Sequence, residues 1–514
     1  MSASARCVLG MDLGTGSLKC VIMDATGRLL ASAERSYPSK NPHPGWAEQD
    51  PGDWVEAMRE ALAELSAREP GLIAGLEGIS LCSAAHIPVL LDGEDKVIRP
   101  AILWSDQRSD IEVAALSANH GNFLEETALN EAGCTWTLPQ LLWIRDHEPD
   151  VLPRVRQLLS SKDYLVFRLT GTFSMDPGSA AATLMLDTRH KAWSPALTAL
   201  SSLPVSAFPP LLDPLAVAGR ITAEAAQLFG LPIGIPVISG SLDSAAEMLG
   251  CGILVPGELG MVRAGTAGGI MAVTDQPAFN RGIITYPHVL NGLYYKQAGT
   301  NACATSLQWI RNLCMAIRGE DAPELTYEEL NQFAAKAEPG AGGLVFHPYL
   351  QGERAPYWNA ELRGSFTGID QGHSWPQFIR AVMEGVAFSL LDCLGMFRRD
   401  GMDMNAAVMT GGVVKSPIWS QIITDVLGLE TRTIRQGDSA LGACMMAATG
   451  VGIFSNMHEA VKVCVVHERT MTPNPENHAH YIRIFERYRE VSCFLDATES
   501  KNINSSENSS LLFR

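Results

Sequence analysis

The sequence predicts an α/β protein built from two similar halves. Short apolar runs that suit strands alternate with segments whose apolar residues recur at helical spacing. A strand–loop–strand pattern with a Gly/Thr loop occurs near the start, at residues 12–17 (DLGTGS), and again at residues 265–268 (GTAG). The chain has 514 residues, which is too long for one core and fits two sizeable domains.

The first half opens with strands joined by tight turns. The predicted strands of this half cover residues 7–11, 18–23, 29–33, 78–81 and 89–91. A helix is predicted between the third and fourth strands, at residues 51–67. Its apolar side carries Trp54, Met58, Ala61, Leu62 and Leu65. Alternating strands and helices of this kind favour α/β layers over a helical bundle or a β-sandwich.

The second half repeats the opening pattern and then adds helices. Residues 258–264 and 269–273 predict strands on either side of the GTAG loop. A long helix is expected after Ser374, because Gln377 stands at the capping-box position. Residues 439–450 (SALGACMMAATG) predict a helix of small residues, which suits close helix packing.

The composition restricts the class of partner. Lys and Arg number 39 and Asp and Glu 56, and the net charge of −17 gives no overall attraction toward nucleic acid or anionic lipid. No apolar run is suited to spanning a bilayer. The eleven cysteines are scattered and contain no CxxC pair, which favours a reducing compartment. We therefore expect a cytoplasmic protein with no nucleic-acid or membrane partner.

The first Gly/Thr loop carries groups that could hold a nucleotide phosphate. A carboxylate such as Asp12 can meet a phosphate only through Mg²⁺, usually with water between them. Thr15, Gly16 and Ser17 offer backbone N–H groups and hydroxyls, and Lys19 offers a point charge. The spacing is neither a Walker loop nor GxGxxG. The alternative is an ordinary turn capped by Asp12.

Asp243 follows an apolar strand and precedes a short helix, and two roles remain open for it. It could be the N-cap of that helix. Alternatively, Ser244 and Glu247 form an S-x-x-E capping box one residue later, which leaves the Asp243 carboxylate outside the helix. A free carboxylate at a domain junction can accept a proton from a substrate hydroxyl.

A further group of residues could bind a sugar. Trp104, Asp106 and Arg108 (WSDQR) place an aromatic ring beside an acid and a base, so the ring could pack on sugar C–H faces while the carboxylate accepts hydroxyl hydrogens. The alternative is a surface ion pair beside a core tryptophan. A lone histidine between apolar runs, such as His86, is more often a core residue. The glycines at 411–412 form either a turn or a close approach for an adenine ring.

These segments together resemble the FGGY carbohydrate kinases, and within that family the xylulokinase branch. The resemblance runs from about Val8 to about Gly450, and its most specific match is GSFTGIDQGHSWPQFIRAVME at residues 364–384. The other matching segments are DLGTGSLK at 12–19, PHPGWAEQDPGDW at 42–54, RPAILWSDQRS at 99–109, SKDYLVFRLTG at 161–171, GSLDSAAE at 240–247, GTAG at 265–268, GER at 352–354 and GGVVKSPIW at 411–419.

The resemblance implies two actin-like ATPase domains, of the ribonuclease H-like type, around a central cleft. Residues 1–245 would bind the sugar and residues 246–490 would bind ATP, while residues 491–514, Ser/Asn-rich after residue 496, would be a disordered tail. The implied reaction is Mg²⁺-dependent transfer of a phosphoryl group from ATP to a ketopentose, with D-xylulose as the expected sugar. ATP and a small sugar are the implied partners, and a homodimer is a candidate assembly.

The resemblance also assigns roles to residues of this sequence. Asp243 would be the catalytic base and, together with Asp12 acting through water, a metal residue. The expected substrate-binding residues are His86, Trp104, Asp106, Arg108 and Ser244. The expected ATP-binding residues are Gly14, Thr15, Gly16, Ser17, Lys19, Gly265, Thr266, Gly411, Gly412 and Lys415.

Two departures from the family pattern leave the exact sugar open. Residues 83–87 read SAAHI where xylulokinases typically read GQMHG, so His86 is kept while Ala84 and Ala85 replace Gln and Met. Gln140 stands where the first family signature usually has Lys. Glycerol kinases of the family carry an Arg-Glu pair in the segment that corresponds to residues 83–87, and its absence from that segment argues against glycerol. The alternatives are a kinase for another sugar, polyol or sugar acid, or an actin-like ATP-dependent switch without sugar chemistry.

Overall fold

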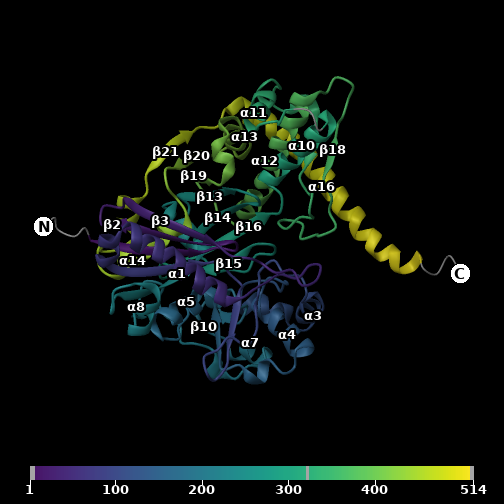
Figure 1. Ribbon diagram of the computed structural model, residues 1–514. Helices are drawn as coiled ribbons and strands as arrows, with labels where there is room; N and C mark the ends of the chain where they lie inside the picture. Colours follow the sequence, from purple (N-terminus) through teal and green to yellow (C-terminus); the bar gives the residue numbers. More distant parts are fainter. Residues whose placement is uncertain (1–5, 320–322, 510–514) are drawn as a thin grey trace.

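A computed structural model describes residues 6–319 and 323–509 and contains two large sheets, one in each half of the chain (Figure 1). The first has the strand order β11-β12-β5-β1-β2-β3 and consists of β1 (Cys7–Leu13), β2 (Ser17–Asp24), β3 (Leu29–Ser36), β5 (Leu76–Ser83), β11 (Val217–Arg220) and β12 (Pro236–Leu242). The second has the order β15-β16-β14-β13-β19-β20-β21 and consists of β13 (Leu259–Ala264), β14 (Gly268–Thr274), β15 (Ile284–Pro287), β16 (Tyr294–Thr300), β19 (Ala406–Thr410), β20 (Glu430–Ile434) and β21 (His467–Met471).

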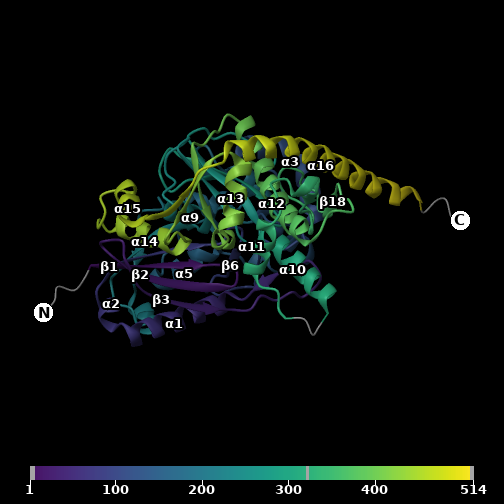
Figure 2. The ribbon, with the colours of Figure 1, turned by 90° about the horizontal axis from the view of Figure 1, so that it is seen from above.

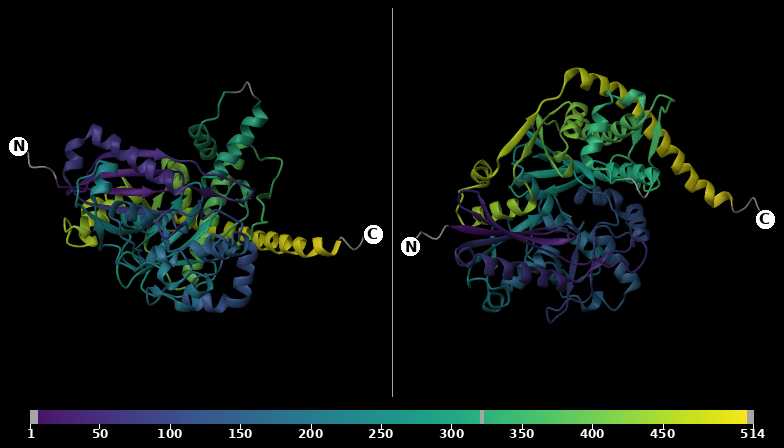
Figure 3. Two further views of the ribbon diagram at one scale, coloured as in Figure 1. Left: turned by 60° about the horizontal axis from the view of Figure 1, so that its bottom comes forward. Right: turned by 45° about the horizontal axis from the view of Figure 1, so that its top comes forward.

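The two sheets share the same central arrangement, which confirms the predicted pair of related α/β halves. Strand β1 is antiparallel to β2 and parallel to β5, and β13 is likewise antiparallel to β14 and parallel to β19. The predicted Gly/Thr loops connect β1 to β2 and β13 to β14, so each loop leaves the carboxyl end of a central strand. Figure 3 shows the two resulting lobes, with the purple-to-teal first half below the green and yellow second half in its right panel.

Helices cover both sheets. The helices of the first half are α1 (Pro51–Arg68), α2 (Pro70–Ala74), α3 (Asp110–Thr127), α4 (Thr137–His147), α5 (Ser161–Thr170), α6 (Pro177–Ala181), α7 (Pro195–Leu200), α8 (Ala223–Phe229) and α9 (Asp243–Gly250). Those of the second half are α10 (Ala304–Arg318), α11 (Tyr327–Ala335), α12 (Trp375–Arg399), α13 (Pro417–Leu427), α14 (Ser439–Gly450), α15 (Met457–Cys464) and α16 (Pro475–Ser509). The short remaining strands are β4 (Glu48–Gln49), β6 (Pro88–Leu91), β7 (Ala101–Ile102), β8 (Gln157–Ser160), β9 (Leu186–Asp187), β10 (Ala192–Trp193), β17 (Val345–His347) and β18 (Ser365–Thr367).

The three helices singled out in the sequence are all present. Residues 51–67 lie in α1, and residues 439–450 form α14. Helix α12 begins after Ser374, whose backbone N–H donates to the Gln377 side-chain oxygen at 3.1 Å. Among residues 6–319 and 323–509 there is no helix long and apolar enough to cross a membrane.

Helix α14 belongs to the second half of the sequence but packs on the first sheet. It lies against β1, β5 and α9. Figure 2 shows its label beside those of β1 and α9. The approach is close because the residues are small: a Cβ on Gly442 would lie 1.9 Å from the Ala246 carbonyl oxygen, and one on Gly10 would lie 2.6 Å from the Ala440 carbonyl oxygen. The predicted small-residue contact is therefore made between α14, α9 and β1.

The segment predicted to be a disordered tail, residues 491–514, begins inside a helix. Helix α16 continues through this segment to Ser509 and extends away from the second lobe (Figure 2). The helix is anchored because Ser492 is buried and hydrogen-bonds to the Tyr349 hydroxyl at 2.7 Å and to the Tyr488 carbonyl at 3.0 Å. Residues 510–514 of the predicted tail lie outside the described residues.

The domain boundary expected between residues 245 and 246 falls inside helix α9, which is continuous over Asp243–Gly250. The last strand of the first sheet ends at Leu242 and the central strand of the second begins at Leu259. Because α14 returns to the first lobe, the halves of the sequence and the packed lobes do not coincide along the whole chain.

Gly442→Ala should destabilise the protein by roughly 1–3 kcal/mol, because the new methyl group meets backbone that cannot rotate away. Chemical unfolding of the parent and the variant measures this difference. Gly121→Ala in α3 is the matched control, since a Cβ there meets open space. That change should stabilise by about 0.5–1 kcal/mol, through the lost flexibility of glycine. Equal effects from the two substitutions would contradict the close α9–α14 contact.

Candidate active site

Asp12 and Asp243 lie at one edge of the first sheet. Asp12 is near the end of β1 and Asp243 directly follows β12, and both strands run parallel to β5 between them. Their registers place Asp12 opposite Cys82 and Leu242 opposite Ser83, so the two carboxylates leave the same carboxyl edge. In open α/β sheets this edge is where ligands bind.

Asp12 is half-buried and is held by a residue from the other half of the chain. The Ser439 hydroxyl, at the start of α14, donates to Oδ2, and the Cys82 thiol lies 3.5 Å from Oδ1. Burial raises the pKa of Asp12, the two hydrogen bonds oppose this, and the charges of Asp438 and Glu247 add to the rise. A cation would be stabilised beside this carboxylate, since the negative charges around it repel one another.

Asp243 is the first residue of α9, and the structure rejects the cap that was considered for it. Leu242 is the N-cap and gives no side-chain bond, while Oδ1 of Asp243 accepts the adjacent Ser244 N–H at 2.6 Å. Burial raises the pKa of Asp243 to about 6, Arg263 acts against this rise, and Asp12 adds to it. A carboxylate with this pKa is suited to accept a proton near neutral pH.

The expected capping box at Ser244 and Glu247 is also wrong. The Ser244 hydroxyl lies 2.8 Å from the Tyr295 hydroxyl, and the Glu247 carboxylate accepts from Thr410 at 3.0 Å and pairs with Arg263. Both side chains turn toward the second lobe because α9 lies between the two sheets and finds partners there. Ser244, expected to bind the substrate, is buried in this contact.

The first Gly/Thr loop is fixed by hydrogen bonds around its backbone. The Gly14 N–H donates to the Ser17 carbonyl at 3.0 Å, and the Tyr37 hydroxyl donates to the Gly14 carbonyl. The Thr15 hydroxyl accepts the Trp104 indole N–H at 3.0 Å, and Gly16 is exposed. The loop therefore joins one residue expected near phosphate to one expected near sugar.

Two polar residues beyond this loop already have partners. The Ser17 hydroxyl donates to Glu34 at 2.6 Å, and the Lys19 ammonium pairs with Asp438, which caps α14. Their expected role in phosphate binding would require these bonds to be exchanged for bonds to the nucleotide.

The second Gly/Thr loop lies directly against the glycine pair expected at the adenosine. Gly411 has φ +91°, and a Cβ there would lie 2.4 Å from the Ala264 carbonyl oxygen and 2.6 Å from the Gly265 nitrogen. This position therefore needs glycine. Gly412 meets open space and begins the short helix η4 (Gly412–Lys415), while Thr266 is exposed at the loop tip. The exposed Lys415 ends η4.

His86 connects the two lobes. Its Nδ1 lies 2.9 Å from the Ala182 carbonyl, and its Nε2 lies 2.7 Å from the Tyr286 hydroxyl on β15. Burial lowers the pKa of His86 to about 4, so the ring is neutral and Nε2 can accept from Tyr286 when Nδ1–H donates to the carbonyl. The Trp136 ring packs edge-on against the imidazole at 4.5 Å between centroids. Neither Tyr286 nor Trp136 was found from the sequence, because nothing in their local patterns marks them.

The WSDQR segment has the reverse of the arrangement considered in the sequence. Trp104 is 41% exposed, whereas Asp106 and Arg108 are buried. Asp106 accepts the Ala47 N–H at 2.6 Å and binds the Arg108 guanidinium through both oxygens, at 2.9 and 2.7 Å. Arg108 also bonds to Glu48 at 2.7 Å and stacks 3.8 Å from the Trp46 ring centroid. The side chains of Asp106 and Arg108 are thus engaged with each other, and only Trp104 remains available to a ligand.

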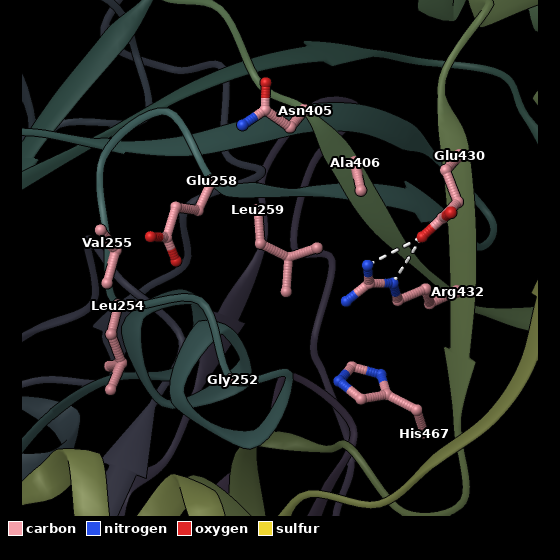
Figure 4. Close-up of a pocket in the computed structure, with 10 residues that line it drawn as sticks. All are labelled: Gly252, Leu254, Val255, Glu258, Leu259, Asn405, Ala406, Glu430, Arg432 and His467. Carbon is pink, nitrogen blue, oxygen red and sulfur yellow. Dashed lines mark hydrogen bonds and ion pairs between the residues drawn. The ribbon is translucent and has the colours of Figure 1, made fainter.

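A pocket of about 500 Å³ lies at the opposite end of the second sheet (Figure 4). It is lined near the beginnings of β13, β19 and β20, where Glu430 and Arg432 hydrogen-bond at 2.8 Å beside His467. None of the expected site residues lines it. Since the Gly/Thr loop and the Gly411 turn follow the carboxyl ends of these strands, this pocket is separate from the candidate active site.

Comparison with known proteins identifies the family. Residues 7–250 match the N-terminal domain of the FGGY family of carbohydrate kinases, and residues 260–451 match its C-terminal domain. The chain belongs to the FGGY family of carbohydrate kinases. It is therefore a sugar phosphotransferase that uses ATP as co-substrate, which confirms the predicted enzyme class and does not support a switch without sugar chemistry.

Several relatives are similar over nearly the whole chain. A xylulose kinase of Lactococcus lactis subsp. lactis is 34% identical over 490 residues, covering 94% of this chain and 96% of the relative. A gluconokinase of Bacillus subtilis is 26% identical over 497 residues, covering 95% and 96%. The crystal structure of a xylulose kinase from Rhodospirillum rubrum superposes with a TM-score of 0.90 at 31% identity, covering 96% of this chain and all of that chain.

Replacing Asp243 by Asn should make the protein more stable, and increasingly so as the pH rises. Because the folded pKa of about 6 lies above the ordinary 3.8, ionisation costs stability as pH rises through this window. The stability difference between variant and parent should therefore grow by about 1.4 kcal/mol from pH 5 to pH 8. Urea unfolding at several pH values measures it, with Asp150→Asn on the exposed surface as control. A pH-independent difference would contradict the raised pKa.

Proposed function

We propose that this FGGY kinase transfers the γ-phosphoryl group of ATP to D-xylulose and forms D-xylulose 5-phosphate. The observation that carries the proposal is the position of Asp243, a carboxylate with a pKa of about 6 at the sheet edge shared with Asp12 and next to the interlobe contacts of His86. The similarity to xylulose kinases over 94% of the chain supports the choice of sugar.

In the proposed mechanism Asp243 accepts the proton of the attacking sugar hydroxyl. The exposed Trp104 face would contact the sugar from the first lobe, and His86 would bind it by exchanging its hydrogen bond to Tyr286 for one to a sugar hydroxyl. The Thr15 and Thr266 loops would hold the phosphates through backbone N–H groups and hydroxyls. Phosphoryl transfer depends mainly on such positioning and on neutralisation of charge.

The donor set also fits a magnesium ion bound mainly through the nucleotide. Within residues 6–319 and 323–509 no cluster of three or more His, Cys, Asp or Glu side chains forms a ready metal site. Mg²⁺ usually keeps several waters and uses one or two carboxylates together with substrate phosphates. Asp12, with its raised pKa and acidic neighbours, would hold the ion through water, near Asp243. The ion would supply neutralisation of phosphate charge.

The location and assembly expected from the sequence remain part of this proposal. All eleven cysteines are free, and ten of them are buried or half-buried, which supports a reducing compartment such as the cytoplasm. A homodimer stays a prediction that gel filtration with light scattering would test.

A panel of sugars in a coupled ADP-release assay tests the substrate. D-xylulose should have the highest kcat/KM among ketopentoses, aldopentoses, polyols and sugar acids, because the likeness to xylulose kinases is greater than that to gluconokinase. Gluconate is the second candidate, since residues 83–87 depart from the xylulokinase pattern and a gluconokinase is similar over 95% of the chain. A tenfold higher kcat/KM for gluconate or another sugar would remove D-xylulose as the substrate.

Asp243→Asn should lower kcat for the preferred sugar by about 10²–10⁴-fold, because the amide keeps the shape of the side chain but cannot accept the proton. ATP affinity should stay within a few-fold of the parent. Steady-state kinetics and nucleotide titration measure the two quantities, and Asp150→Asn serves again as the surface control. Near-parental turnover would mean that another group takes the proton.

A further inference from the structure

Two arginines flank a strip of the second sheet that has no side chains. Across β13, β14 and β16 the register places Arg263 opposite Gly269 and Gly269 opposite Gly299. Directly opposed residues on antiparallel strands project to the same face of a sheet. On this face, Arg263 is therefore followed by two glycines in a row.

This face is the one turned toward the first lobe. Arg263 pairs with Glu247 of α9, and the sulfur of the neighbouring Met261 lies 3.8 Å from the Cys251 thiol just after that helix. The residues of the opposite face, Val262 and Ile270, instead pack in the core with α10 and α12. The glycine strip therefore faces α9, whose first residue is Asp243.

Arg354, from the loop between β17 and β18, occupies the far end of the strip. Its Nη2 donates to the Thr300 carbonyl at 3.3 Å, and the next residue, Ala355, donates its N–H to the Gly299 carbonyl at 3.0 Å. A Cβ on Gly299 would lie 3.0 Å from Nη2 and 3.2 Å from Cζ of Arg354. The guanidinium thus lies directly over a glycine, and a larger residue there would displace it.

The Arg354 guanidinium is incompletely paired. Its Nε is buried and has no hydrogen-bond partner among the described residues. The adjacent Glu353 carboxylate is engaged elsewhere, with the Thr300 hydroxyl at 2.5 Å and the N–H groups of Asn301 and Arg354 at 2.8 Å. Burial lowers the pKa of Arg354, the charge of Glu353 opposes this, and the nearby Arg263 lowers it further. A partly buried cation without full pairing is costly unless a ligand completes it.

We propose that Arg354 is a further catalytic residue, whose guanidinium binds the oxygens of the phosphoryl group during its transfer, with Arg263 as a positioning residue held by Glu247. The placement supports this ligand, because the strip begins one residue after Gly268, where the second Gly/Thr loop ends, and faces Asp243 on the other lobe. The second Gly/Thr loop is expected to hold the phosphates of ATP, and Asp243 is expected to face the sugar hydroxyl. The oxyanion that passes between them is the phosphoryl group.

The reaction step accounts for the charge that Arg354 would meet. The bond from the γ-phosphorus to the bridging oxygen breaks and its electron pair leaves with ADP, while the sugar oxygen forms the new bond to phosphorus and its proton passes to Asp243. Charge is spread over the three equatorial oxygens in the transition state, where a guanidinium fork can bind two of them. The inference rests on phosphoryl transfer through Asp243 and not on the identity of the sugar.

The test compares Arg354→Gln and Arg354→Lys with the parent, and Arg363→Gln is the control on an exposed arginine of the same segment. Arg354→Gln should lower kcat by about 10³-fold, with the KM of the sugar within about threefold of the parent. In Arg354→Gln, the rate of ATP hydrolysis without sugar and the affinity for ADP–aluminium fluoride should also fall. Arg354→Lys should recover part of kcat, of the hydrolysis rate and of this affinity. Arg363→Gln should match the parent throughout.

Two results would overturn the proposal. A raised KM for the sugar with unchanged kcat and unchanged ADP–aluminium fluoride affinity would make Arg354 a sugar ligand, for instance for a carboxylate. A fall of kcat below tenfold would make it structural. Should the glutamine variant fail to fold, which a thermal melt shows, the lysine variant carries the same comparison. Because hydrolysis and ADP–aluminium fluoride binding need no sugar, they still report on Arg354 if D-xylulose is not the substrate.

Discussion

The packing of α14 between α9 and the first sheet is the constraint on which the candidate site depends. Gly442 allows the α14 backbone to touch that of Ala246, and Gly10 allows the same helix to touch β1. This contact brings Ser439 to the Asp12 carboxylate, although the two residues are 427 positions apart. It also fixes the start of α9, where Asp243 lies. The geometry of the candidate site thus depends on backbone contacts that only small residues permit.

A second consequence is electrostatic. The same packing gathers Asp12, Asp243 and Glu247, and burial, with a smaller contribution from the repulsion between the carboxylates, raises the pKa of the two aspartates. Arg263 limits the rise at Asp243, and Arg354 lies beyond it over the glycine strip. Carboxylates that would accept a proton or a hydrated cation therefore face guanidinium groups that would bind oxyanions, which is the charge distribution that phosphoryl transfer requires.

Much of the fold could be predicted from the sequence, because its signals are local. The strands around both Gly/Thr loops, α1, the start of α12 and α14 follow from apolar periodicity, capping and small-residue composition. The site was harder to predict from the sequence, because the partners of its side chains come from distant segments of the chain. The Ser244–Glu247 box matched a local pattern, but both residues found partners on the second sheet. The Ser/Asn-rich composition after residue 496 predicts a disordered tail, whereas the contact that anchors the helix leading into it, between Ser492 and Tyr349, joins distant parts of the chain and has no local signal.

The same difference between local and distant signals explains the segment that was expected to bind sugar. WSDQR looked like a sugar platform because its residue types suit one, yet the buried pairing of Asp106 with Arg108 satisfies both charges inside the first lobe. That pairing holds the segment in place and leaves Trp104 exposed beside Thr15. The buried pair therefore positions Trp104, whose side chain is available to a ligand. His86 also acts through a partner. Its neutral imidazole accepts a hydrogen bond from Tyr286 on the second lobe. Tyr286 belongs to the same sheet as Arg263 and the second Gly/Thr loop, so this bond connects the first lobe, where the sugar is expected, to the strands expected to hold the phosphates.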